Sequence, residues 1–474
     1  MKRRKGTRKS QATRPKAQAR NKRSDEAKSP LRPRIGFHSL PIEILDTVFK
    51  HAPKTTLLTS SRVSRLWRDF ALPHLFASIR VARETSYDDF FDFLHARPKF
   101  VRYIRSLKLI STSLYFGPHP TIDPPFLHML VEKLPRLQEL SLEQIGINLS
   151  ASPSTDTPVQ DMAGPPRTRR PDGAFKLKQL SINRCIFNGS RSYYDGCDLY
   201  TLFTVLHMLP TNSIHVIGMW VGMPDSFDRN HPRIRCLSPL DISSLSLEDS
   251  HLSFTNYTPI QAHLERDALF CDALRQMLTP QQLHTLRLGI ELVDRSKTRV
   301  DALGKLLRHA VNRDLRDFAL PFKIQYPIDA QEEDAGADFW RLLRLECFPE
   351  LETFGISLNL PSPGMQPAHG GVPRAHFSAV CIAIMSHLPR TLRILELTLW
   401  GVKELSQLKN TWAIDPGRID DALQEYFPSL AKFRVVFRSR YYLLEFATFF
   451  WKAMPKSKAR GILEVTDTLF SPYK

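Results

Sequence analysis

The sequence predicts an α/β protein in which a small all-α segment precedes a horseshoe-shaped solenoid of about ten parallel strands. Helical periodicity over residues 35–82 predicts the first part. Strand-like apolar patterns at a mean spacing of about 36 residues, each followed by a helical pattern, predict the second part over residues 83–474. A chain of 474 residues is too long for one ordinary core, whereas a stacked array lets the core grow with chain length.

Residues 1–34 form a basic tail that we expect to be disordered. The tail has fourteen Lys and Arg against two acidic residues, which gives it a net charge of +12 out of +18 for the whole chain. It contains almost no large apolar side chain, so burial does not offset the entropy of folding. Two basic clusters are typical of a two-part nuclear import signal bound by an importin: Lys2, Arg3, Arg4, Lys5, Lys22 and Arg23. The alternative is a solubilising or RNA-binding tail.

Residues 35–82 hold two amphipathic helical patterns. Pro41 suits the first turn of a helix and Glu43 suits its positive end, and the apolar stripe that follows consists of Ile44, Leu45, Val48 and Phe49. A second stripe stops at Pro73 and consists of Leu57, Leu58, Val63, Leu66, Trp67 and Phe70. Helices this short bury little apolar surface by themselves, so we expect them to need a partner.

This segment resembles the F-box in three parts that occur in the right order and at the right spacing. The parts are Leu40-Pro41-Ile42-Glu43-Ile44-Leu45, Leu57-Leu58 and Val63-Ser64-Arg65-Leu66-Trp67-Arg68. Ser64 replaces the commoner Cys, and Thr56 replaces the acidic residue often found before the Leu pair, which affects the expected affinity more than the fold. With the array behind it, the chain is similar to fungal-type F-box proteins with irregular leucine-rich repeats.

The resemblance implies docking onto the Skp adaptor of a cullin-based ubiquitin ligase. The candidate contact or support residues are Leu40, Pro41, Ile44, Leu45, Leu57, Leu58, Val63 and Trp67. Buried aliphatic and aromatic anchors are the expected carriers of such an interface. The alternative is a helical cap on the array that binds nothing.

The array is predicted from ten strand patterns. Their middle apolar residues are Leu107, Leu140, Leu180, Ile217, Leu245, Leu286, Phe318, Phe354, Leu395 and Phe433. The segment Leu177-x-x-Leu180-x-Ile182-x-x-Cys185-x-Phe187 resembles the full leucine-rich-repeat pattern. Helical patterns follow at residues 199–209, 268–278, 300–311, 339–345, 377–388 and 419–427. Prolines at positions 98, 135, 210, 280, 349, 389 and 428 predict where the helices end before each strand.

The irregular segments gather between a strand and the next helix, so we expect them on one rim of the array. Two of them, residues 150–173 and 361–373, are expected to be disordered. Side chains that flank the strand anchors should point to the concave face, and the candidates for client binding are Trp220, Glu139, Glu143, Arg287, Glu396 and Arg434. The mixed sign of this surface suits a protein partner better than a phosphate backbone. The alternative for Trp220 is a place in the core.

No nucleotide-binding, hydrolase or metalloprotease motif occurs, so we expect no catalytic residue, metal or cofactor. The six cysteines lack zinc-ligand spacing and are expected to be small core residues of a reduced protein. No apolar run reaches the ~18 residues that a membrane span requires. We therefore expect a nuclear or cytoplasmic protein without a membrane contact.

The predicted function is a non-catalytic substrate receptor that binds a Skp adaptor, and through it a cullin, while the array holds an unknown protein client. One alternative is a nuclear protein-interaction scaffold without a ligase role, whose basic tail binds nucleic acid. Another is an F-box-like protein that binds the adaptor but not the cullin. Because residues 35–474 carry a net charge of only +6, nucleic acid is expected at the tail if anywhere.

Overall fold

The computed structural model describes residues 40–112, 119–149, 176–187, 197–224, 226–248, 251–253, 260–289, 292–293, 297–311, 313–323, 339–359, 376–400, 402, 405–409, 414–437 and 443–467. The basic tail with its six import residues and the two insertions predicted to be disordered, residues 150–173 and 361–373, lie outside this part of the chain.

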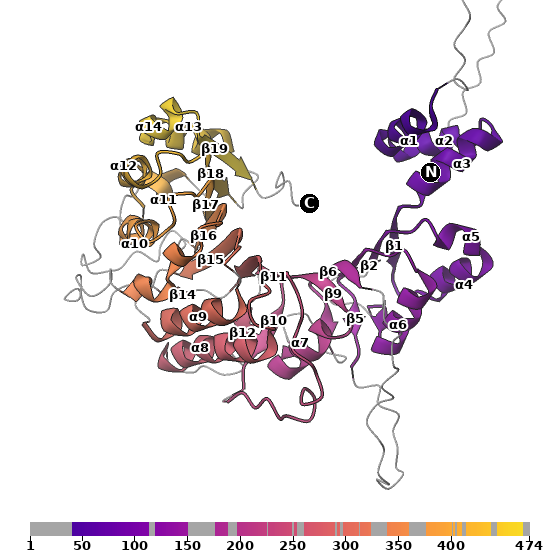
Figure 1. The fold of residues 1–474 in the computed structure, drawn as a ribbon, viewed down its shortest axis with the longest axis horizontal. Coiled ribbons are helices and arrows are strands. Elements are labelled where there is room, and N and C mark those ends of the chain that lie inside the picture. Colours follow the sequence, from indigo (N-terminus) through magenta and orange to yellow (C-terminus); the bar gives the residue numbers. More distant parts are fainter. Residues whose placement is uncertain are drawn as a thin grey trace, which may run out of the picture.

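Three short helices open the described chain: α1 (Ile42–His51), α2 (Lys54–Ser60) and α3 (Arg65–Leu75). Pro41 and Pro53 directly precede α1 and α2, and the Ser64 hydroxyl caps α3 by accepting a 3.3 Å hydrogen bond from the backbone N–H of Trp67. The helices form a small core of their own around Phe49. They lie at one end of an arc whose other end carries the C-terminal helices (Figure 1).

A large parallel sheet follows. It contains β1 (Ser78–Arg83), β2 (Ser106–Ser111), β4 (Glu139–Glu143), β6 (Leu177–Asn183), β9 (Thr211–Ile217), β11 (Ser244–Glu248), β13 (Thr285–Leu288), β15 (Asp317–Lys323), β16 (Thr353–Asn359), β17 (Ile394–Trp400), β18 (Lys432–Phe437) and β19 (Leu463–Asp467). These strands pair in chain order, and β14 (Leu292–Val293) also joins β15, which gives thirteen strands in the described residues. The predicted parallel sheet is confirmed. All ten predicted strands are present, and the sheet begins at Ser78, inside the segment assigned to helices.

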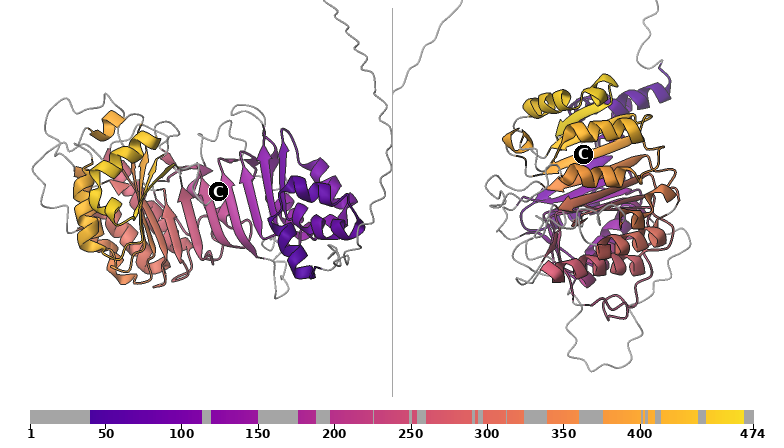
Figure 2. Two further views of the ribbon diagram at one scale, coloured as in Figure 1. Left: turned by 90° about the horizontal axis from the view of Figure 1, so that it is seen from above. Right: turned by 90° about the vertical axis from the view of Figure 1, so that its left-hand side faces the viewer.

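Helices cover one face of this sheet. They are α4 (Asp88–Ala96), α5 (Pro98–Val101), α6 (Pro124–Lys133), α7 (Leu199–Leu206), α8 (Ile260–Met277), α9 (Lys297–Ala310), α10 (His376–Met385), α11 (Leu405–Lys409), α12 (Pro416–Tyr426), α13 (Leu443–Ala453) and α14 (Pro455–Ala459), with the 3-10 helices η3 (Phe339–Leu343) and η4 (Leu345–Cys347). The strands line the inner side of the arc and the helices the outer side (Figures 1 and 2). Asp123, Asp198 and Asp415 cap α6, α7 and α12 with their carboxylates.

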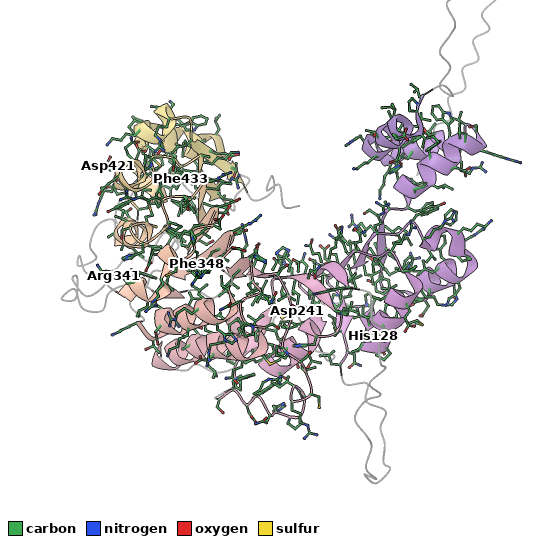
Figure 3. All side chains as sticks on the ribbon, viewed as in Figure 1. His128, Asp241, Arg341, Phe348, Asp421 and Phe433 are labelled. Atoms are coloured by element: carbon green, nitrogen blue, oxygen red, sulfur yellow. The ribbon has the colours of Figure 1, made fainter. Side chains whose placement is uncertain are left out.

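One long core fills the space between the sheet and these helices. Nine of the ten predicted anchors, from Leu107 to Phe433, are at most 2% exposed there. Figure 3 shows side chains filling this layer, and Phe433 lies within it near the C-terminal end. None of the helices in the described part of the chain covers the inner face of the sheet (Figure 1). The alternation of strand side chains therefore separates a buried face from a face that a partner can reach.

The C-terminal ends of four strands turn into a second set of short strands. They are β5 (Gly146–Ile147), β7 (Ile186–Phe187), β10 (Trp220–Gly222) and β12 (His251–Ser253), which pair in two small sheets with β3 (Thr121–Ile122) and β8 (Cys197–Asp198). Three of the turns hold a residue at positive φ: Gln144 (55°), Arg184 (50°) and Gly218 (65°). The sequence predicts only irregular loops on this rim, so these short strands are a difference from the prediction.

The register of β9 corrects one predicted anchor. Ile214, not Ile217, pairs with Leu180 and is fully buried. Trp220 consequently follows the turn at Gly218 and belongs to β10, outside the large sheet, so its predicted place on the concave face is wrong. Apolar residues stand at positions 214, 216, 217 and 219–221. This pattern alone does not fix the register, which hydrogen bonds to the neighbouring strands decide.

The cysteines divide into two groups. Cys185, Cys197, Cys271 and Cys381 are buried, as predicted, and burial raises the pKa of the Cys185 thiol to about 12. Cys236 and Cys347 are exposed, so the prediction that all six are core residues is wrong for these two. Cys236 lies in a turn and Cys347 ends the short 3-10 helix η4. In such segments no strand or α-helix periodicity indicates which side chains are buried.

Candidate functional site

The residues predicted to contact a Skp adaptor divide into a core group and a surface group. Leu45 and Leu57 are only 4% and 3% exposed, and Trp67 is partly buried against Phe49 with ring centroids 5.7 Å apart. These three side chains hold the helices together. Their replacement is therefore expected to act on folding before it acts on binding.

The surface group forms a set of exposed apolar side chains. From the prediction it includes Ile44 (50% exposed), Leu58 (46%) and Val63 (64%), with Pro41 exposed and Leu40 partly buried beside them. Six of the nine large hydrophobic side chains that are exposed in the described chain lie on α1 to α3 or, for Val63, in the turn before α3: Ile42, Ile44, Val48, Leu58, Val63 and Leu66. We call these six residues the apolar helical surface.

Three members of this surface were not among the predicted contacts: Ile42, Val48 and Leu66. Ile44 and Val48 are four residues apart and thus lie on one face of α1, about one turn from each other. The apolar stripes in the sequence contained Val48 and Leu66. However, a stripe does not distinguish the side chains that face the core from those that face solvent.

Polar contacts fix the three helices to one another and to the sheet. His74 Nε2 lies 2.8 Å from Asp46 Oδ1 and joins α3 to α1. Lys54 Nζ donates a 2.7 Å hydrogen bond to the Ser78 carbonyl and joins α2 to the first strand. The apolar helical surface thus stands on a platform with defined geometry at the end of the arc.

The second candidate surface is the concave face of the sheet. One register row crosses it from β1 to β19 and consists of Arg80, Lys108, Ser141, Ser181, His215, Ser246, Arg287, Ala319, Gly355, Glu396, Arg434 and Glu464. Charged side chains occupy both ends of this row, and its middle consists of small or hydroxyl side chains interrupted by His215 and Arg287. The face is polar, whereas the opposite face of the same strands is apolar.

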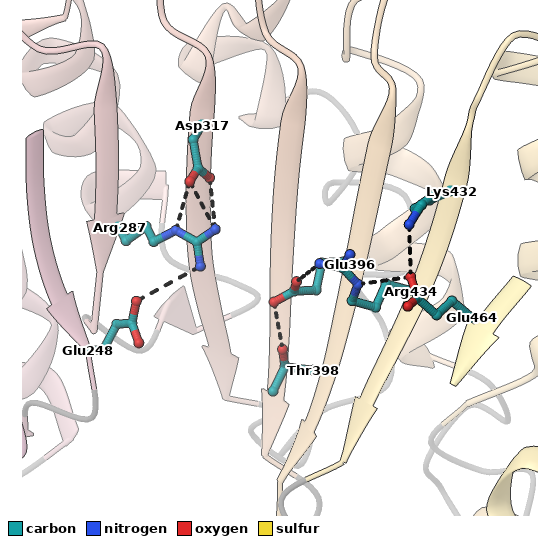
Figure 4. A network of polar contacts seen from close by, with 8 residues as sticks. All are labelled: Glu248, Arg287, Asp317, Glu396, Thr398, Lys432, Arg434 and Glu464. Carbon is teal, nitrogen blue, oxygen red and sulfur yellow. Dashed lines mark hydrogen bonds and ion pairs between the residues drawn. The ribbon is translucent and has the colours of Figure 1, made fainter. Parts of the chain in front are cut away.

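Ion pairs cross the C-terminal half of the concave face in two groups (Figure 4). In the first, Arg287 lies 2.9 Å from Asp317 and 3.9 Å from Glu248. In the second, Arg434 lies 3.3 Å from both Glu396 and Glu464, and Lys432 lies 3.6 Å from Glu464. We call these seven residues the concave charge ladder.

The ladder changes the titration of two carboxyl groups. Burial opposes ionisation of Glu248, but His215 at 3.7 Å, the charge of Arg287 and a hydrogen bond from the Ser246 hydroxyl outweigh it and lower its pKa to about 2. For Asp317 burial prevails over the favourable Arg287 charge, and with the nearby carboxylate of Glu396 it raises the pKa above the usual range. Neighbouring groups therefore stabilise the ionised form enough to outweigh burial at Glu248 but not at Asp317.

Five of the six predicted client-binding residues lie on the concave face. Arg287, Glu396 and Arg434 come together in the ladder, although α-helices and loops separate them in the chain. Glu143 pairs with Lys108 at 2.6 Å in the N-terminal half, and Glu139 is exposed there. The prediction missed Asp317 and Glu464. Asp317 directly precedes the anchor Phe318, so the rule used for the other candidates would have included it.

Within the described residues, no three or more His, Cys, Asp or Glu side chains lie close enough together to hold a metal ion. None of the helices in this part of the chain is long and apolar enough to cross a membrane.

The comparisons with known proteins concern the first surface. A family model described as F-box-like matches residues 37–81, which contain α1 to α3 and much of β1. No curated protein matches the chain. F-box domains are typical of non-catalytic adaptor subunits and bind a Skp adaptor in ubiquitin ligases. The apolar helical surface lies entirely within the matched residues.

Proposed function

We propose that the protein is a substrate receptor of a Skp/cullin/F-box ubiquitin ligase and has no catalytic role of its own. The observation that carries the proposal is the position of the apolar helical surface within the residues that match the F-box-like model. In this function α1 to α3 dock on the Skp adaptor, which in turn recruits a cullin.

The energetics of the helices favour a partner on this surface. The six side chains are 41% to 66% exposed, so covering them would contribute about 1 kcal/mol each before the costs of association. Several large apolar groups that belong to one short helical segment and remain in water are typical of an interaction site. The polar contacts of Lys54 and His74 hold the platform in place, which lowers the entropy lost on binding.

We further propose that the region after the helices is a leucine-rich-repeat-like horseshoe that holds a protein client on its concave face. Support comes from the parallel strands in chain order and from the polar inner face, which none of the described helices covers. The client would be ubiquitinated because the ligase brings it close to the conjugating enzyme. The basic tail, with Lys2 to Lys5 and the Lys22-Arg23 pair, would direct the protein to the nucleus.

The test of adaptor binding uses the full-length protein and a purified Skp adaptor. Ile44→Asp should weaken the complex at least about thirtyfold in calorimetry, which corresponds to a hot spot of about 2 kcal/mol. Met129→Asp is the matched control, since Met129 is a 41% exposed hydrophobic residue on α6, outside the matched residues. Circular dichroism should show both variants folded.

Equal affinity of the wild-type protein and Ile44→Asp, or no binding by the wild-type protein, would contradict the docking surface. Adding a cullin to the wild-type complex tests the ligase role. Binding of the Skp adaptor without the cullin would leave an adaptor-binding protein outside a ligase. For the tail, diffuse distribution of a reporter fused to residues 1–34 would exclude nuclear import.

A further inference from the structure

We propose that the concave face binds a basic segment of the client, with one Arg or Lys side chain placed over Gly355 between Asp317 and Glu396. This inference rests on the client-holding part of the proposed function and specifies the chemistry of the client.

The concave charge ladder is interrupted at β16. The neighbouring strands β15 and β17 contribute Asp317 and Glu396 to the concave face. Strand β16 instead presents Thr353, Gly355 and Ser357 on the same face, none of which is charged. The two groups of ion pairs thus end on either side of an uncharged strand, and each ends with a carboxylate.

Small residues line this part of the concave face. Gly355 stands opposite Ala319 on β15 and Glu396 on β17. The two backbones hold these positions so close that a Cβ atom added to Gly355 would lie 2.9 Å from the Cβ of Ala319. The side chains here project less far from the sheet than Arg287 or Arg434, and neighbouring groups already bury Gly355 itself.

The charge of the ladder is not balanced. Its seven described side chains are four carboxylates and three cations, and His215, 3.7 Å from Glu248 and far from the uncharged strand, adds a positive charge only when it is protonated. Asp317 and Glu396, the two carboxylates nearest the uncharged strand, are 19% and 17% exposed, so they are already largely removed from solvent. A client that covers them must neutralise the remaining charge or bury it at high cost.

A cationic client group satisfies this requirement and an anionic one does not. Arg287 and Arg434 each already pair with two carboxylates, so a phosphate would have to compete with those carboxylates for both guanidinium groups. An Arg side chain over Gly355 could instead donate to Asp317 on one side and Glu396 on the other. The raised pKa of Asp317, to which burial and Glu396 contribute, agrees with a shortage of positive charge at this place.

The test selects random twelve-residue peptides displayed on phage against the immobilised full-length protein, with fluorescence anisotropy of the selected peptides. Wild-type protein should enrich peptides with Arg or Lys and few acidic residues. Glu396→Gln should bind them about tenfold more weakly, because it removes a charge that the peptide pairs with. Ser357→Arg, which supplies a cation from β16 itself, should bind them at least as poorly.

Ser181→Arg is the control, because it adds the same charge to the same face on β6 and should leave the affinity unchanged. Binding of the Skp adaptor is measured for every variant and reports on the helices separately. Enrichment of neutral or acidic peptides, no enrichment at all, or basic peptides that ignore both Glu396→Gln and Ser357→Arg would overturn the inference. Loss of adaptor binding by the wild-type protein would instead contradict the ligase role alone.

Discussion

The N-terminal helices should unfold without the sheet when Phe49 is replaced by Ala. Phe49 is 3% exposed and packs against Trp67 and Phe70, with ring centroids 5.7 and 6.2 Å apart. Its core is separate from that of the sheet: Phe49, Leu57 and Ala71 form the buried cluster, and Leu45 is also buried in α1. Weaker packing in this core should therefore have little effect on the packing of the sheet.

The magnitude follows from the size of that core. A buried Phe→Ala change costs about 3–5 kcal/mol. A helical unit as small as α1 to α3 has only about 2–5 kcal/mol of net stability, so the loss is as large as the whole. We expect α1 to α3 to be unfolded for most of the time in the variant, while the sheet and its long core stay folded.

Hydrogen exchange followed by mass spectrometry measures both parts at once. In Phe49→Ala, protection of amides in α1 to α3 should fall about a hundredfold or more, and protection in β2 to β18 should stay within a factor of about three. Ile44→Ala, at a residue 50% exposed, is the control and should keep its protection. Unchanged protection of the helices, or an equal fall in the sheet, would refute the separate core.

Three further changes test packing and charge, each by urea denaturation. Gly304→Ala in α9 should destabilise the protein by about 1–2 kcal/mol despite the better helix propensity of Ala, because the new Cβ would lie 2.2 Å from the Leu342 carbonyl oxygen. A stabilised variant would show that α9 and η3 move apart easily. Glu248→Gln should lower the free energy of unfolding by about 1 kcal/mol at pH 7, a value discounted for the 39% exposure of Glu248. Since the pKa of Glu248 is lowered to about 2, the difference between the two proteins should shrink as the pH falls from 4 towards 2. A difference that does not change with pH would exclude the ion pairs as its cause. Asp420→Ala should lower the free energy of unfolding by about 2 kcal/mol, because its carboxylate is 2% exposed and accepts hydrogen bonds from two backbone N–H groups at the start of α14. The control Asp421→Ala, at a side chain 67% exposed, should have little effect. Equal losses of stability would contradict the role of Asp420 as a cap.

Much of the architecture was predictable because it depends on local patterns. Strands and helices have different apolar periods, and a proline such as Pro210 stops a helix whatever surrounds it. The order of the strands followed as well, since successive repeats can only stack on their neighbours. The missed strands β1 and β19 are the ends of the array, where one neighbour is absent and the pattern is weaker.

The candidate surfaces were predictable only in part. The motif that contains Ile44 and Leu45 identifies the docking segment, yet these adjacent residues are 50% and 4% exposed. An apolar stripe in the sequence includes both exposed residues such as Ile44 and buried residues such as Leu45. Which side chains remain at the surface was decided by where the three helices pack on one another.

By itself, the sequence determined a helical segment with F-box-like residues, a parallel α/β array after it, and a polar side to each strand. Only the tertiary structure decided that Trp220 lies outside the large sheet and that Arg287, Asp317, Glu396 and Arg434 come together. The physical reason is that strand register and ion pairs join residues about 30 to 38 positions apart. Such contacts depend on how neighbouring repeats align, which no local periodicity contains.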